Sequence, residues 1–323
     1  MDKNGNTSLP GLESGSHFPL LRLPPEIVLL ITRHLKPQYR FFLAQTCTVL
    51  RALAWCNVKK ELARVSFVEE FEAWQAIAYH SPNHWACVNC VRLHAVDTSD
   101  TPLNRQHQCG YSLDDSRPRR RRLSSSSSVE YDFQDHHAQL ALKFDHLGNV
   151  HGEYLRRLLA SHTTQSQINE YLTRTSYMHP MIINRRLILH KVQVYENTVL
   201  PITDDTIEND SPRICPHVSS KPLDGVSVED IRSISSEYAL YEAFVLFPGQ
   251  EILLHCPLCS TDYSFQATGK HEFVLRVWHD FGAHITYLRS WERTCRTFWD
   301  YPVENWSEHE PGSIRELYLT GGQ

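Results

Sequence analysis

Residues 20–55, LLRLPPEIVLLITRHLKPQYRFFLAQTCTVLRALAW, predict three short helices near the start of the chain. Pro25 suits the first turn of a helix, where a missing backbone N–H costs little. Pro37 ends this first helix, because the residue before a proline avoids the helical conformation. A second helix is expected from Gln38 to Thr46 and a third around Val49 to Leu53.

The first of these helices is apolar on more than one side. Ile27, Ile31 and Leu35 recur at intervals of four residues, and residues 28–30 are also aliphatic. One face can therefore pack inside a small helical unit while another remains available to a partner. The periodicity is equally compatible with a helical subdomain that packs only on the rest of its own chain.

The order of residues carries a family resemblance. The residues concerned are Leu23-Pro24-Pro25-Glu26-Ile27, Ile31, Leu35, Leu43 and Cys47. They resemble the F-box pattern, LPxE[IL] followed by spaced aliphatics. The resemblance implies that the helices bind a Skp-type adaptor of a cullin RING ubiquitin ligase, while the rest of the chain captures an unknown protein substrate without catalysis of its own. It also implies adaptor contacts by four residues, Leu23, Pro24, Ile27 and Leu30.

Other segments resemble a group of F-box proteins common in filamentous fungi. These segments are HWACVNCVRLH at 84–94, FDHLGNVHG at 144–152, and STDYSF and LRVWHDFGAH near the C-terminus. The resemblance then extends over most of the chain, although only the F-box and the CxxC elements are specific. This chain departs from the group in a long insertion rich in arginine and serine.

Composition sets the scale of the remaining domain. The sequence has 323 residues, of which 41% are hydrophobic, enough for one small module and one larger domain with its own core. We expect residues 1–16 to be disordered, residues 17–56 to form the F-box and residues 57–323 to form the larger domain. The polar N-terminus and the absence of a long apolar run predict a protein of the cytoplasm, the nucleus or both, without a membrane contact.

The larger domain is expected to be α+β, with most strands in its second half. The predicted helices cover residues 68–79 and 137–143 and pass through 154–159, and the predicted strands cover 187–195, 239–247 and 271–278. Residues 112–130, SLDDSRPRRRRLSSSSSVE, are predicted to form a disordered insertion. It is either a solvated loop without a function or a nuclear-import or anion-binding segment, and Ser124, which follows two arginines, is a candidate phosphorylation site.

Two groups of cysteine and histidine have the spacing of metal ligands. Cys256 and Cys259 form a CxxC pair after an expected strand, and Cys215 and His217 lie about forty residues earlier. Three thiolates and an imidazole suit a structural zinc ion, which prefers four such ligands in a tetrahedron. The competing interpretation is two independent pairs, because buried free cysteine is also a common small hydrophobic residue.

The other candidate group lies earlier in the chain and consists of Cys87, Cys90, His94 and Cys109. Its spacing is less regular, and the first CxxC pair could instead join Cys256 and Cys259 in an all-cysteine site. The sequence leaves both pairings open. Nine cysteines are an odd number, which does not suit a fully paired disulfide framework.

Two other classes of function compete with a substrate receptor. A thiol-dependent enzyme could use a cysteine near a histidine, but the CxxC pair lacks the βαβ context of a redox motif, and no GxSxG or phosphate-binding Gly loop occurs. A nucleic-acid-binding zinc protein would account for the cysteine pairs and the arginine run. The formal net charge of -5 and the lack of a short CxxC-to-HxxxH finger argue against nucleic acid as a partner.

Overall fold

The computed structural model describes residues 19–88, 90–104, 109, 131, 133–148, 150–210, 212, 214, 215, 217, 218, 236–257, 259–283 and 309–321. The predicted disordered regions, 1–16 and 112–130 with Ser124, therefore lie outside the described residues. The chain divides into two compact units, Met1–Ala73 and Trp74–Gln323. The first unit thus extends beyond the boundary expected at residue 56.

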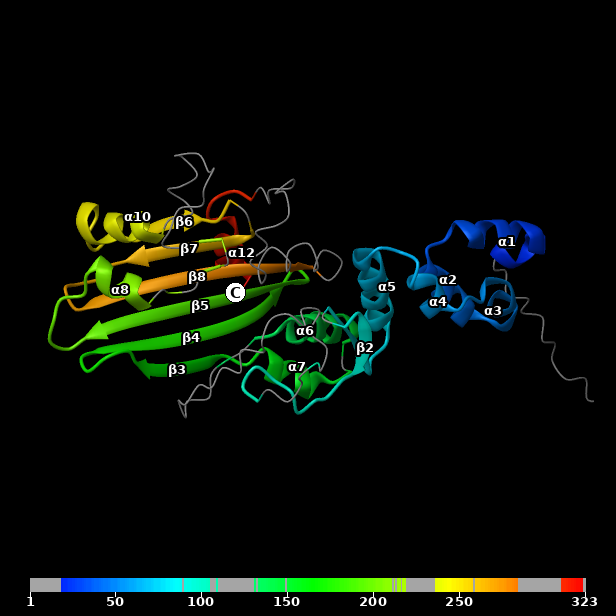
Figure 1. Ribbon diagram of the computed structural model, residues 1–323, viewed down its shortest axis with the longest axis horizontal. Coiled ribbons are helices and arrows are strands. Elements are labelled where there is room, and N and C mark those ends of the chain that lie inside the picture. The colour runs from blue at the N-terminus through cyan, green and yellow to red at the C-terminus, as the bar shows by residue number, and fades with distance from the viewer. Residues whose placement is uncertain are drawn as a thin grey trace, which may run out of the picture. The chain divides into compact units, whose positions relative to one another are not determined.

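The first unit is helical throughout its described part (Figure 1). Its elements are the 3-10 turn η1 (Pro19–Arg22) and the helices α1 (Pro25–His34), α2 (Pro37–Thr46), α3 (Thr48–Ala54), α4 (Val58–Leu62) and the beginning of α5 (Phe67–His80). Helix α1 buries Val28 and Thr32, one turn apart. Arg40 of α2 donates to Glu61 of α4 at 2.7 Å, which joins the second and fourth helices.

The second unit is built on two antiparallel sheets (Figure 1). The smaller sheet is the hairpin β1 (His84–Cys87) and β2 (Arg92–Ala95). The larger sheet has the order β3-β4-β5-β8-β7-β6, with strands β3 (His162–Gln167), β4 (Leu172–Ile183), β5 (Arg186–Asn197), β6 (Ile252–His255), β7 (Thr261–Gln266) and β8 (Glu272–Ala283). Its helices are α6 (Asp135–Leu147), α7 (Gly152–Leu158), α8 (Asp204–Asp210), α10 (Ser236–Tyr241), the π-helical segment η2 (Glu242–Leu246) and α12 (Ser313–Gly321). The expected α+β class is confirmed.

The larger sheet is packed on both faces, because successive residues of a strand point to opposite sides. On one face Tyr195 and Phe273 belong to the main core, which also includes residues of α8 and α10. On the other face Ile188 and Trp278 pack against Ile314 of α12. A one-residue slip of any central strand would exchange these two sets of side chains.

The strand predicted at residues 239–247 is wrong, since this segment forms α10 and η2. Its buried residues include Ala239, Leu240 and Ala243, which have the spacing of a helix and not the alternation of a strand. Strand propensity is weak and yields to packing of this kind. Strands β5 and β8 match the predicted strands at 187–195 and 271–278, whereas the other described strands were not predicted. Strand β3, for example, has the polar sequence HTTQSQ and carries no apolar alternation.

A buried carboxylate fixes α12 to the sheet. Asp262 of β7 accepts hydrogen bonds from the backbone N–H groups of Gly312, Ile314 and Arg315, at 3.1, 2.8 and 3.0 Å, and faces His309 at 3.2 Å. These donors are the otherwise unsatisfied N–H groups at the start of the helix, where negative charge is also favourable. Burial acts to raise the pKa of Asp262, but the hydrogen bonds from His309 and from the backbone N–H groups of Arg315 and Gly312 outweigh it and lower the pKa.

Substitution Asp262→Asn should destabilise the docking of α12 by about 1–3 kcal/mol, because the amide loses the charge and one acceptor. The matched control is Glu316→Gln, an exposed carboxylate in the first turn of the same helix, for which we expect less than about 0.5 kcal/mol. Chemical unfolding and limited proteolysis near residue 309 measure both effects. Since the pKa of Asp262 is lowered, its contribution is present above about pH 4, the pKa of an unfolded aspartate, and is lost as the pH falls through the folded value. Equal stability of the two variants would contradict this role.

Candidate metal centres

Four predicted ligands from two distant segments come together in the second unit. Cys215, His217, Cys256 and Cys259 place their ligand atoms within 4.8 Å of one another. We call them the second ligand set, because the other candidate group, around Cys87, comes earlier in the chain. The CxxC pair occupies the turn between β6 and β7, where the N–H of Cys256 donates to the carbonyl of Thr261 at 2.8 Å and the N–H of Thr261 donates to that of Cys259 at 2.7 Å. A tight hairpin turn of this kind directs both thiols to one side.

The geometry of the second ligand set fits a tetrahedral ion such as zinc. Nδ1 of His217 lies 3.7 Å from Sγ of Cys256. Bonds of about 2.3 Å to sulfur and about 2.0 Å to nitrogen place two ligands of a tetrahedral zinc ion roughly 3.6 Å apart. The histidine would therefore offer Nδ1 to a metal ion.

The thiols of this set have opposed proton affinities. Burial acts to raise the pKa of Cys215, but hydrogen bonds from Cys256, Cys259 and His217 lower the pKa well below its usual value. Hydrogen bonds with Cys215 and Cys256, together with burial, raise the pKa of Cys259 well above its usual value. Crowded thiols without a cation have to share protons in this way, whereas a divalent ion stabilises all of them as thiolates. The donor set thus fits a metal ion.

The first ligand set consists of Cys87, Cys90, His94 and Cys109, whose ligand atoms also lie within 4.8 Å of one another. Cys87 ends β1 and Cys90 lies in the turn that leads to β2, and His94 projects from β2 with Nε2 at 3.0 Å from Sγ of Cys90. Burial and, to a smaller extent, a hydrogen bond with Cys109 raise the pKa of Cys90. The structure does not combine the two CxxC pairs in one site, so the all-cysteine alternative is wrong.

The turn of the first ligand set is strained and supported from one side. Val91, directly after Cys90, has a φ of 51°, a left-handed conformation that is unfavourable for a β-branched residue. Helix α6 holds the hairpin, because the Gln139 amide accepts from the N–H of Ala86 at 2.7 Å and donates to its carbonyl at 3.1 Å. The ammonium of Lys143 donates to the carbonyls of Ser81 and His84. An isolated two-stranded hairpin is marginal in water, so this support and a bound ion would both stabilise it.

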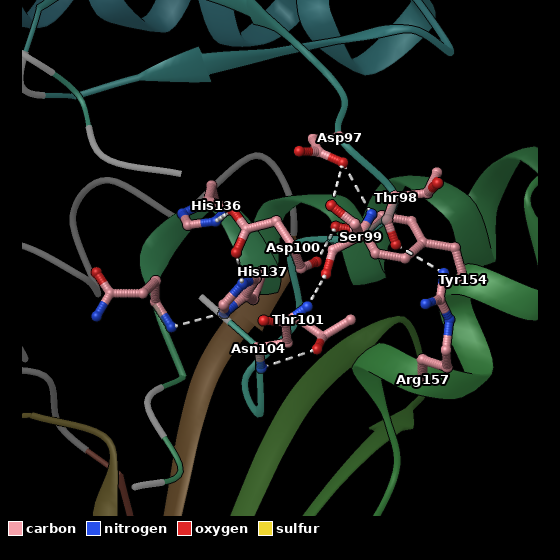
Figure 2. Close-up of polar contacts among 11 residues, drawn as sticks. Asp97, Thr98, Ser99, Asp100, Thr101, Asn104, His136, His137, Tyr154 and Arg157 are labelled. Carbon is pink, nitrogen blue, oxygen red and sulfur yellow. Dashed lines mark hydrogen bonds and ion pairs between the residues drawn. The ribbon is translucent and has the colours of Figure 1, made fainter. Parts of the chain in front are cut away.

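A third polar cluster was missed by sequence reasoning (Figure 2). Asp100, His136 and His137 are all buried, with Nε2 of the two histidines 2.8 and 3.4 Å from the carboxylate oxygens of Asp100. Adjacent histidines are the local signal, but Asp100 lies 36 residues before His136 in no recognisable motif. The cluster adjoins the first ligand set, because Trp85 stacks between His94 and His136 at centroid distances of 4.9 and 4.8 Å.

The hydrogen bonds of His137 argue against a metal ion in this cluster. The backbone N–H of Gln134 donates to Nδ1 of His137 at 3.1 Å, which completes the capping box of α6. A neutral ring that accepts at Nδ1 carries its proton on Nε2 and has no lone pair there for a metal. His137 therefore donates from Nε2 to Asp100. The cluster is better described as a hydrogen-bonded brace between α6 and the segment after β2.

The predicted adaptor-binding residues lie in the first unit. Leu23, Pro24, Ile27 and Leu30 are all exposed there. Pro24 is the N-cap of α1, Ile27 and Leu30 lie within this helix, and Leu29 and Ile31 of the same helix are exposed as well. The candidate phosphorylation site Ser124 lies outside the described residues.

Substitution of one cysteine in either ligand set should remove one metal ion. We expect the purified chain to hold two ions, one per set, and we expect Cys90→Ser and Cys256→Ser each to lower the content by about one. His136→Gln in the third cluster should leave two ions bound, although the lost hydrogen bond costs about 1–3 kcal/mol of stability. Elemental analysis beside circular dichroism measures both. Loss of an ion from a folded His136→Gln protein would overturn the assignment of the third cluster.

Comparisons with family models, with curated proteins and with solved structures find no match for this chain. Among the described residues, no helix is long and apolar enough to cross a membrane. The assignment of a function therefore rests on the residues of the chain and on the geometry given above.

Proposed function

We propose that this protein is an F-box-type substrate receptor. Its first unit docks on a Skp-type adaptor of a cullin RING ubiquitin ligase, and its second unit presents a protein for ubiquitination. The observation that carries the proposal is the exposed apolar side of α1, together with the resemblance of residues 23–27 to the F-box pattern.

The exposed side of α1 is available to a partner, because other residues of the helix pack it into the first unit. Val28 and Thr32 are buried within the unit, whereas Ile27, Leu30 and Ile31 are 42%, 50% and 39% exposed. Exposed aliphatics cost free energy in water at roughly 25 cal/mol per Å², and their concentration on one preformed helix is typical of a docking surface. A helix that lays its apolar side in a hydrophobic groove is a common mode of recognition.

We further propose that both ligand sets hold structural zinc. Zinc suits sets of three cysteines and one histidine, and sites closed by four protein ligands usually have a structural role. In the second ligand set zinc would join the segment of Cys215 and His217 to the β6–β7 hairpin. In the first it would cross-link the strained turn after β1 to His94 and Cys109.

The proposed receptor holds its substrate in position and contributes no catalytic group. When a substrate is held beside the conjugating enzyme of a ligase, the effective concentration of its acceptor lysine rises. No acid, base or nucleophile of this chain is required for that effect.

A thiol-dependent enzyme is the weaker alternative. Cys256 is fully buried and Cys259 is 2% exposed, so neither sulfur can reach a carbonyl group of a large substrate. Both thiols also lie within contact range of two other potential ligands. If the protein were an enzyme of this class, the turnover of its substrate would be lost in the Cys256→Ser variant.

The proposal predicts capture of a Skp-type adaptor by the full chain. Leu30→Arg should reduce the capture about 10-fold or more, because a charge replaces an apolar contact at the centre of the surface. Leu319→Arg is the matched control, since Leu319 is also an exposed helical leucine, 52% against 50%, but belongs to α12 of the second unit. Co-purification followed by calorimetric titration gives the two affinities.

Two outcomes would contradict the proposal. One is a folded wild-type chain that captures no adaptor, and the other is an equal loss of capture in Leu30→Arg and Leu319→Arg. Circular dichroism of each variant separates a lost contact from a lost fold.

A further inference from the structure

We propose that Thr261 and His279 form an outer shell of the second ligand set and donate a chain of hydrogen bonds to the Cys259 thiolate. This inference rests on the proposed metal site and goes beyond it, because neither residue is a ligand. Thr261 acts on the ion through Cys259, and His279 acts through Thr261.

The contacts form a continuous path from the sulfur into the sheet. Oγ1 of Thr261 lies 3.2 Å from Sγ of Cys259 and 2.8 Å from Nδ1 of His279. Thr261 begins β7, and His279 lies directly opposite it on β8. Thr261 is fully buried and His279 is 6% exposed, so bulk water does not replace these hydrogen bonds. The register of the two central strands thus holds the path in place.

The direction of the path follows from proton counting. A metal-bound thiolate has no proton and can only accept, so the Thr261 hydroxyl must donate its single proton to Sγ of Cys259. Oγ1 of Thr261 then accepts from Nδ1–H of His279. Burial lowers the pKa of His279 to about 4, so the ring is neutral at pH 7 and carries one proton. In the metal-bound protein that proton lies on Nδ1.

Hydrogen-bond donors of this kind change the affinity of a site for its metal ion. A hydrogen bond to a thiolate withdraws charge from the sulfur and fixes its orientation, and loss of an outer-shell partner typically costs 10- to 100-fold in metal affinity. The backbone of Thr261 is held separately, through the N–H and carbonyl groups that bond to Cys259 and Cys256. A change of its side chain therefore tests the hydroxyl without removing the turn.

The test compares Thr261→Val, which keeps the shape and removes the hydroxyl, with Thr261→Ser, which keeps the hydroxyl. Thr32→Val is the matched control, because Thr32 is also a buried threonine, 3% exposed, and its hydroxyl donates to the carbonyl of Leu29 in α1. Zinc affinity of the full chain is measured by competition with a chelator. Cadmium NMR of the cadmium-loaded chain gives one resonance per occupied ligand set, and nitrogen NMR reports which nitrogen of His279 carries the proton.

We expect Thr261→Val to weaken one of the zinc sites about 10-fold or more and to shift one cadmium resonance, the one that Cys256→Ser abolishes. Thr261→Ser should restore both properties, Thr32→Val should change neither, and His279 should carry its proton on Nδ1 in the zinc-loaded protein. Wild-type affinity and an unshifted resonance in Thr261→Val, while the wild-type chain binds the metal, would overturn the outer shell alone. A wild-type chain without metal in the second ligand set would overturn the proposed zinc site and this inference together.

Discussion

The register of the β6–β7 hairpin is the constraint on which the second unit depends. The backbone bonds of the Cys256–Cys259 turn align His255 with Asp262 and leave Thr261 as the first residue of β7. Because successive residues of a strand face opposite sides, Thr261 points to the thiols while Asp262 points to α12. A slip by one residue would bury the hydroxyl under the helix and the carboxylate among the thiols. One turn therefore determines both the candidate metal centre and the attachment of the C-terminal helix.

Both ligand sets are built on a β-hairpin with a CxxC pair, but different parts of the second unit support the two hairpins. Each CxxC pair lies where one strand of a hairpin turns into the next, and a two-residue gap there brings the sulfurs together. The β6–β7 hairpin extends a six-stranded sheet and gains a large core, whereas β1 and β2 form a sheet of two strands. The smaller hairpin therefore relies on side chains of α6 and tolerates a left-handed Val91. A metal ion bound at both sets would therefore contribute a larger fraction of the local stability at the first ligand set than at the second.

Local patterns in the sequence predict much of this structure, and long-range pairing accounts for the rest. The helices around residues 25–54 follow from proline positions and apolar spacing, and both ligand sets follow from short cysteine spacing. Residues 239–247 contain strand-forming side chains but pack as a helix, which only the tertiary context decides. Asp100 meets His136, and Thr261 meets His279, through topology and strand register, neither of which leaves a motif in the sequence. The F-box assignment remains a prediction, since it depends on a partner.

The proposed receptor would supply only proximity, and a protein of that kind depends on the rigidity of the part that holds its substrate. Effective concentration falls when the presenting surface samples many orientations, so local unfolding reduces the output even where every contact with the substrate is intact. Hairpin turns and helix termini are usually the first parts of a small domain to open, since few apolar contacts hold them. In this protein the β6–β7 turn places its two thiols beside Cys215 and His217, and Asp262 of β7 holds the start of α12. The contacts of Asp262 limit opening at this end of the sheet, where an open structure would otherwise begin, and an ion bound by the second ligand set would limit it further.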